Sequence, residues 1–309
     1  GPAEGGLTPG TGVRVIFGLL PKNPIPTMKR LLSHVALVAM PLLSVAQDLP
    51  APSPKATLQQ RVGLTDITVE YSRPSAKGRK VFGDLVPYGE VWRTGANKAT
   101  AITIKGDVLL NDQPLPAGTY SLFTIPYEGG AWEVILNKNT ELWGAYDRKP
   151  EEDVLRMKVP AKECATTETF TMEFANLGQD VADLLIRWEN QEAAVRISAD
   201  ATEQGKANIK EAVAKADAGY RTFYSAASFY LERNIDAKQA LAWAQQSVSK
   251  EKKYWNTFVL AKAQAANGLY KEAAATAQEA AKLAATEKDA GAEKTYGKMA
   301  TEWAAKAGK

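Results

Sequence analysis

The sequence predicts an α+β multidomain protein in which an antiparallel β-sandwich precedes an all-α helical domain. All 16 prolines lie at or before Pro160, whereas alanine is concentrated after residue 198. Short segments of alternating apolar and polar residues fill the first region, and longer proline-free segments fill the second. The expected organisation is an unstructured or untranslated upstream segment (1–27), a signal peptide (28–46), a linker (47–54), the β-sandwich (55–198) and the helical domain (199–309).

Residues 28–46 have the layout of a secretory signal peptide. Two basic residues follow Met28, an apolar run comes next, and the small residues Ser44 and Ala46 precede the expected cut before Gln47. We therefore expect an exported protein, either periplasmic or secreted. Contact with the membrane is expected only in passing, through the signal peptide.

Composition excludes several kinds of chemistry for the exported chain. Removal of residues 1–46 leaves equal numbers of basic and acidic residues, so we expect no nucleic-acid partner. The one histidine, His34, leaves with the signal peptide, which excludes Ser-His-Asp catalysis and His-ligated metals. The single cysteine excludes an internal disulfide. We expect no cofactor and no metal, and we expect binding in preference to catalysis.

The first region contains a series of short strands separated by turn residues. Gly63, the pair Gly106-Asp107 and the run Glu128-Gly129-Gly130 mark three of these turns, and the first two predict hairpins. Strands and helices do not alternate, so a doubly wound nucleotide-binding fold is not expected. The expected strands cover residues 58–62, 67–72, 100–105, 108–110, 119–125, 132–136, 167–174, 184–188 and 194–197.

The second region predicts six helices joined by short loops, which favours antiparallel pairs. Small residues repeat with an offset of 33, since Ala240, Ala244 and Ser247 recur as Ala273, Ala277 and Ala280. This pattern resembles a tetratricopeptide repeat, which implies closely packed helix pairs. We expect the helices either to buttress the structure or to bind a peptide or protein partner. Their expected ranges are about 200–216, 220–232, 237–249, 254–267, 270–285 and 289–306.

The segment from residue 79 to residue 100 is the densest in aromatic, charged and amide side chains. Its tryptophan could stack on a sugar ring, and its arginines could hold a carboxylate in a bidentate fork. The predicted ligand is therefore a glycan or a carboxylate-bearing molecule. The alternative is a structural loop whose tryptophan closes one end of the sandwich. The candidate ligand-binding residues are Arg79, Trp92, Arg93 and Asn97, with Trp143 and Tyr146 as secondary candidates.

Acidic residues allow a rival hypothesis of catalysis. Glu90 and Asp153 could act as acid and base in a carboxylate-dependent glycan hydrolase. The acidic run 151–153 could instead bind calcium, or Asp153 could pair with an arginine. A third hypothesis is a purely structural or assembly role, in which all of these side chains are buried.

Several motifs resemble the DUF2911 family. They are Tyr71-Ser72-Arg73-Pro74, Gly78-Arg79, Phe82-Gly83, Val91-Trp92-Arg93-Thr94-Gly95-Ala96-Asn97, Pro116-Ala117-Gly118-Thr119-Tyr120, Trp143-Gly144 and Asp153-Val154-Leu155-Arg156. The resemblance covers about residues 53–198, and relatives with helical tails extend it to about residue 305. It implies an exported protein of a kind common in Bacteroidetes, with no assigned activity. It supplies no catalytic residue.

Overall fold

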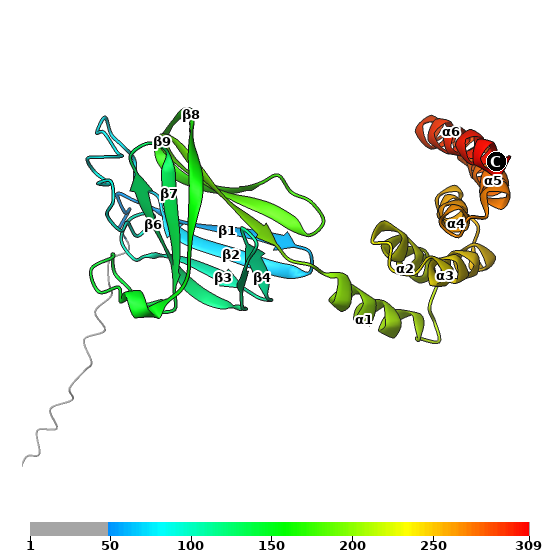
Figure 1. Ribbon diagram of the computed structural model, residues 1–309, viewed down its shortest axis with the longest axis horizontal. Coiled ribbons are helices and arrows are strands. Elements are labelled where there is room, and N and C mark those ends of the chain that lie inside the picture. The colour runs from blue at the N-terminus through cyan, green and yellow to red at the C-terminus, as the bar shows by residue number, and fades with distance from the viewer. Residues whose placement is uncertain (1–48, 309) are drawn as a thin grey trace, which may run out of the picture. The chain divides into compact units, whose positions relative to one another are not determined.

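The computed structural model describes residues 49–308, so the expected upstream segment, the signal peptide and the start of the linker lie outside the described residues. The α+β architecture is confirmed: an antiparallel sheet is followed by six helices (Figure 1). The strands are β1 (Lys55–Val62), β2 (Thr65–Ser72), β3 (Thr100–Ile104), β4 (Val108–Leu110), β5 (Gln113–Leu115), β6 (Gly118–Tyr127), β7 (Ala131–Asn137), β8 (Asp153–Ala175) and β9 (Val181–Ser198).

All nine strands form one sheet in the order β1-β2-β3-β6-β7-β8-β9-β4-β5. The long strand β8 joins its two halves, because residues 153–160 pair with β7 and residues 161–175 pair with β9. The register shifts twice between residues 163 and 171, as expected where a strand bends. The layers predicted as a sandwich are thus two halves of one continuous sheet. Both halves enclose a single apolar core, to which Ile67, Trp132 and Ile186 belong.

Two of the three predicted turns are confirmed. Gly63 has a φ of 58° and connects β1 to β2, while Gly129 and Gly130 have positive φ between β6 and β7. The predicted hairpin at Gly106-Asp107 is wrong, because β4 pairs with β5 and β9 and not with β3. Gly106 does not adopt the positive φ that a two-residue hairpin requires, and the Asp107 carboxylate accepts a hydrogen bond from the Ala117 N–H.

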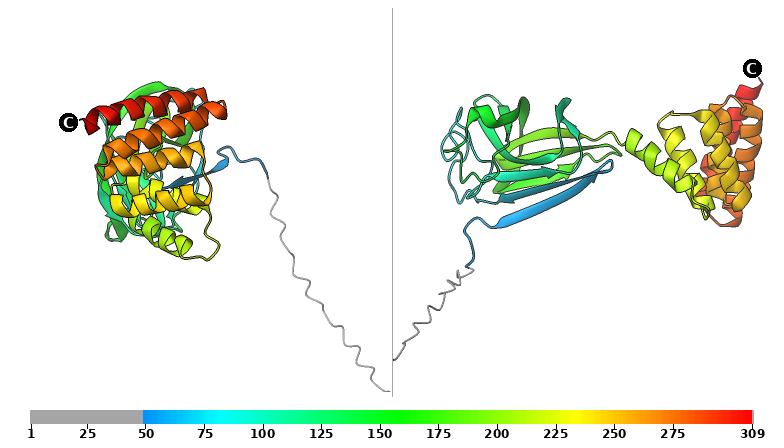
Figure 2. Two further views of the ribbon diagram at one scale, coloured as in Figure 1. Left: turned by 90° about the vertical axis from the view of Figure 1, so that its right-hand side faces the viewer. Right: turned by 90° about the horizontal axis from the view of Figure 1, so that it is seen from below.

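The six helices begin and end within a few residues of the predicted positions. They are α1 (Thr202–Val213), α2 (Tyr220–Glu232), α3 (Ala237–Lys250), α4 (Tyr254–Ala266), α5 (Tyr270–Thr286) and α6 (Ala290–Ala307). Asp236 caps α3 and Asp289 caps α6, each through its side chain. Figure 2 shows the helices stacked in chain order. None of the helices in residues 49–308 has the length and apolar character needed to cross a membrane.

The small residues of the sequence repeat lie at the contacts between helices. Ala240 and Ala244 on α3 are fully buried, and so are Ala273 and Ala277 on α5. A small side chain at such positions lets two helix axes approach closely. The packing role predicted for the repeat is confirmed, whereas its membership of the tetratricopeptide class stays a prediction.

Candidate functional site

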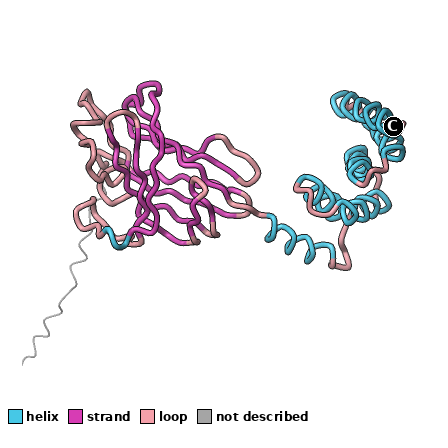
Figure 3. The backbone as a smooth tube through the Cα atoms, viewed as in Figure 1, coloured by secondary structure: helices cyan, strands magenta, loops and turns pink. Residues whose placement is uncertain are grey.

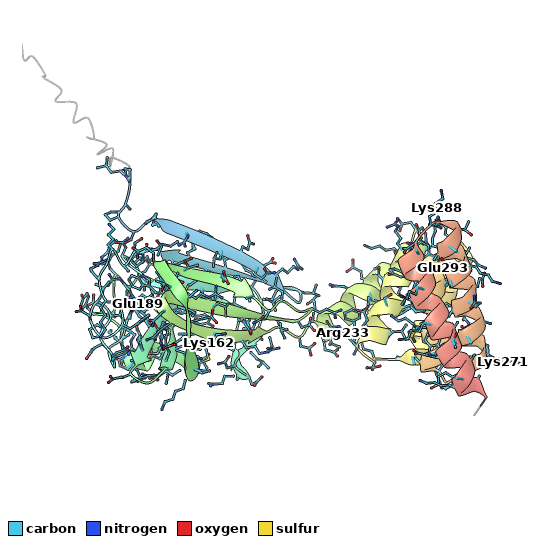
Figure 4. All side chains as sticks on the ribbon, turned by 90° about the horizontal axis from the view of Figure 1, so that it is seen from above. Lys162, Glu189, Arg233, Lys271, Lys288 and Glu293 are labelled. Carbon is cyan, nitrogen blue, oxygen red and sulfur yellow. The ribbon has the colours of Figure 1, made fainter. Side chains whose placement is uncertain are left out.

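The loops gather at one end of the sheet part, where the 3₁₀ helix η1 (Pro150–Glu152) also lies (Figure 3). Two loop residues at this end form backbone bridges with different strands. Ser75 forms a bridge with Thr169 of β8, and Trp92 forms one with Thr124 of β6. Glu189 of β9, labelled in Figure 4, accepts a hydrogen bond from the Phe82 N–H. The loop end is therefore held by backbone and side-chain hydrogen bonds.

Trp92 lies in the core and does not offer a ring face to a ligand. Its side chain is 9% exposed, and its indole N–H donates to the Gly95 carbonyl at 3.0 Å. The ring stacks on Trp188 at a centroid distance of 5.6 Å and meets Phe170 edge-on at 5.0 Å. The expectation that Trp92 stacks on a ligand is not met. Trp92 instead has the structural position of the alternative hypothesis, at one end of the sheet.

Asn97 and Arg79 also have local partners. Asn97 adopts a φ of 61°, and its amide nitrogen lies 3.4 Å from the Ser72 hydroxyl. The Arg79 guanidinium is exposed and donates to the carbonyls of Ser75 and Ala76, both at 2.8 Å. Arg79 stabilises its own turn, whereas Asn97 links its loop to the distant Ser72. Both side chains are therefore engaged by partners within the protein.

The proposed catalytic pair is not formed. Asp153 is buried and accepts two hydrogen bonds from Arg148, at 2.7 and 2.6 Å. The two carboxylates lie at different positions along β6. Asp153 pairs with Asn137, which lies opposite residue 121 of β6. The exposed Glu90 follows Gly89, whose N–H donates to the carbonyl of residue 126. At a rise of ~3.3 Å per residue these positions are about 17 Å apart along the strand, beyond the roughly 5–10 Å between glycosidase carboxylates.

The calcium hypothesis for residues 151–153 fails for a related reason. Asp153, the innermost of the three carboxylates, is engaged by Arg148 and by the amide of Asn137. In residues 49–308 no group of three or more His, Cys, Asp or Glu side chains is placed to hold a metal ion. The expected ion pair between Asp153 and an arginine is confirmed.

A cluster of Arg93, Trp143, Gly144 and Tyr146 remains, and we call it the Arg93 cluster. Trp143 is 69% exposed and Tyr146 is 89% exposed. A Cβ atom at Gly144 would lie 3.1 Å from the Tyr146 ring and 3.8 Å from Arg93 Nη1. The tyrosine ring and the guanidinium therefore flank the same small space, although they are 53 residues apart in the chain.

The loop that presents these aromatic residues is anchored firmly. Leu142 is buried with Phe123 and Ile135 in a small core on the outer face of β6 and β7, and its carbonyl accepts from the Ala99 N–H at 3.0 Å. At the base of the loop, the Asn137 amide donates to the carbonyl of Lys149 at 3.1 Å. These anchors fix the loop between Asn137 and Lys149. They leave Trp143 and Tyr146 facing solvent on a supported backbone.

Another buried carboxylate of the sheet, Glu192, is satisfied by two cations. Glu192 accepts from Arg187, and its second oxygen lies 2.9 Å from Lys162 Nζ. Burial by itself raises the pKa of Glu192, but the hydrogen bonds from Lys162 and Arg187 hold it below the usual value. Burial, and after it the charge of Glu192, raises the pKa of the Cys164 thiol. The thiol is therefore a weak nucleophile at neutral pH.

Among the helices, Tyr224 and Trp255 line a shallow depression together with Arg221. The Arg221 guanidinium lies 5.9 Å from the centre of the Trp255 ring, and its Nε donates to the Tyr220 hydroxyl. Nothing in this geometry singles out a binding partner. The peptide or protein partner predicted for the helices stays a prediction.

These features define a class of protein. It has an antiparallel sheet followed by helices, and the loop end of the sheet presents two exposed aromatic side chains, of which Tyr146 lies beside an arginine. Residues 53–197 match the family described as DUF2911, protein of unknown function. The match runs from just before β1 almost to the end of β9, and it supports the family assignment that the motifs predicted. No curated protein matches the chain, and no solved structure does.

Sequence reasoning found three of the four residues of the Arg93 cluster as candidates but did not assign Gly144 a role. The motif Trp143-Gly144 was visible as a family signature. A glycine is needed at position 144 because its φ is 89° and because it lies close to Arg93, and both facts depend on the fold.

Proposed function

We propose that this chain is an exported, non-catalytic binding protein whose sheet part holds a glycan at the Arg93 cluster. The observation that supports a binding role is the exposure of Tyr146 beside Arg93, with the exposed Trp143 on the same loop. Large aromatic side chains that face water next to a cation are common at binding sites, since leaving them exposed stabilises nothing in the free protein. Export rests on the sequence layout of residues 28–46.

A sugar suits this surface because its ring has an apolar face and a polar rim. The apolar face can stack on an aromatic ring, as large rigid aromatic side chains provide contact area with little loss of conformational freedom. The hydroxyl groups can accept from the guanidinium, which carries several donors in one plane. The anchored loop between Asn137 and Lys149 presents the aromatic residues on a fixed backbone, which lowers the entropy lost on binding.

The engaged state of Asp153 favours binding over turnover. An acid or base must be free to exchange a proton with the substrate, whereas Asp153 is held by Arg148 and Asn137. The Glu90–Asp153 pair that a hydrolase would need is not assembled.

A glycan array on the chain from Gln47 onward tests the proposal. We expect binding to at least one sugar class, and a loss of about tenfold or more on substitution of Trp143→Ala or Tyr146→Ala, because stacking on one ring is worth about 1–3 kcal/mol. Leu177→Ala is the matched control, since Leu177 is 57% exposed and lies outside the Arg93 cluster. Retained binding in both aromatic variants, or no binding to any sugar by the parent chain, would refute the proposal.

A further inference from the structure

Arg93 stands apart from the other arginines that the structure describes. Its Nε atom is buried, and no acceptor among residues 49–308 bonds to it. Every other arginine in that part of the chain has at least one hydrogen bond or ion pair to a described residue. These are Arg61, Arg73, Arg79, Arg148, Arg156, Arg187, Arg196, Arg221 and Arg233.

The missing partner is an energetic cost that calls for an explanation. A buried donor without an acceptor costs about 1–3 kcal/mol, and more when the group is charged. Arg148, on the loop that faces Arg93, shows the usual solution, because Asp153 accepts two hydrogen bonds from it. Arg93 has no such carboxylate in the described part of the chain. Within residues 49–308 its Nε thus stays buried and unpaired, and the terminal nitrogens are the part of the charge that a ligand can reach.

A glycine brings its loop close to the guanidinium. Gly144 adopts a φ of 89°, which other residues rarely adopt. A Cβ there would lie 3.8 Å from Arg93 Nη1 and 3.1 Å from Tyr146. A larger residue at position 144 would therefore crowd the tyrosine ring. The position thus combines a guanidinium that has no acceptor among residues 49–308 with an exposed aromatic ring.

We propose that Arg93 binds a carboxylate of the ligand, so that the ligand class is an acidic sugar such as a hexuronate. This inference rests on the proposed function and specifies its ligand. The planar carboxylate matches the planar guanidinium, and a charge-assisted pair is stronger than a neutral hydrogen bond. The sugar ring that bears the carboxylate lies against Tyr146. The carboxylate pairs with the terminal nitrogens of Arg93, which are not among its buried atoms.

Pairs of ligands that differ only in charge test this assignment. The probes are hexuronate oligosaccharides and their carboxyl methyl esters, titrated calorimetrically against the chain from Gln47 onward. We expect the acid to bind at least tenfold more tightly than the ester, and added salt to weaken the acid alone. Equal affinities for acid and ester would overturn the inference and leave the proposed function standing. Binding of neither probe, together with an empty glycan array, would remove both.

Variants of the arginine give an independent readout. Arg93→Gln should abolish the preference for the acid, so that acid and ester bind with equal affinity. Arg79→Gln is the matched control, because Arg79 is also an arginine of the loop end but donates to carbonyls of its own turn. A preference that survives in Arg93→Gln contradicts the inference. If Arg93→Gln does not fold, the comparison of acid and ester on the parent chain still decides. A sulfated sugar that binds as tightly as the hexuronate would show that charge, and not a carboxylate, is recognised.

Discussion

At the scale of single residues, the environment separates side chains that look equivalent in the sequence. Trp92 and Trp143 were both candidates for stacking on a ligand. Trp92 lies among Phe82, Phe170 and Trp188 in the core, whereas Trp143 is 69% exposed. An indole has a large apolar surface, so burial is favoured wherever the fold provides a pocket. The residue type alone does not reveal on which side of the sheet that pocket lies.

The ion pair of Arg148 and Asp153 yields a prediction at the same scale. Their side chains are 8% and 4% exposed, so loss of one partner leaves a buried, unpaired charge. Arg148→Met should lower the free energy of unfolding by about 3 kcal/mol. The double variant Arg148→Met with Asp153→Asn should recover part of this loss, since it removes the orphaned charge and allows a hydrogen bond with Asn137. Urea denaturation measures both. Equal destabilisation of the single and double variants would argue against the pair as the cause.

At the scale of elements, helices were predicted more accurately than strand connections. A helix depends on residues close in sequence and on its caps, such as Asp236 and Asp289. A strand depends on distant partners. Asn111 and Asp112, both with positive φ, form the tight turn between β4 and β5, which was not predicted. Residues 153–166 were not among the predicted strands, yet they form the first half of β8.

The hairpin of β1 and β2 supplies a prediction for an element. Gly63 has a φ of 58°, and a Cβ there would clash with the carbonyl oxygen of Ala199. Gly63→Ala should therefore destabilise the sheet part by more than the roughly 1–2 kcal/mol that a left-handed conformation alone costs. Gly78→Ala is the control, because Gly78 has a φ of 73° with nothing within 4 Å. Thermal unfolding compares the two. A similar loss in both variants would mean that the clash is relieved without cost.

At the scale of the whole molecule, the sheet and the helices have separate cores of different composition. The sheet core contains large side chains such as Trp132 and Trp188, whereas the helical contacts depend on alanines such as Ala261 and Ala277. Alanine buries less apolar area per residue, so the helices rely on close backbone approach and on aromatic side chains between them. Phe258 of α4 stacks on Tyr296 of α6 at a centroid distance of 3.8 Å.

This packing predicts an alkaline weakness of the helices. Burial, with smaller contributions from Tyr254, Asp289 and Tyr224, raises the pKa of Tyr296 to about 12 from its ordinary value of 10.0. The unfolded chain therefore loses this proton first, so stability falls as the pH rises from 10 towards 12. Tyr296→Phe should lessen this fall, since it has no proton to lose. Denaturation followed by far-ultraviolet circular dichroism at several pH values measures the difference. An identical pH dependence in parent and variant would contradict the prediction.

Much of the candidate site could be named from the sequence, but its assembly could not. Arg93, Trp143 and Tyr146 were identified by residue type. Trp92, Asn97 and Arg79 were identified on the same grounds and have structural partners instead. The difference lies in contacts between segments far apart in the chain, such as the bonding of residue 99 to Leu142. Local sequence carries no direct signal for such contacts.

The sequence by itself determined the two-part architecture, the helix positions and the absence of histidine after residue 34, and its motifs anticipated the match of residues 53–197 to DUF2911. These follow from local periodicity, composition and motifs. Only the tertiary structure decided that β8 joins both halves of one sheet, that Trp92 is core, and that Gly144 lies close to Arg93, which has no partner among residues 49–308. The reason is physical: burial and pairing are properties of residues brought together by long-range strand pairing, and they exist only once the sheet has closed around its core.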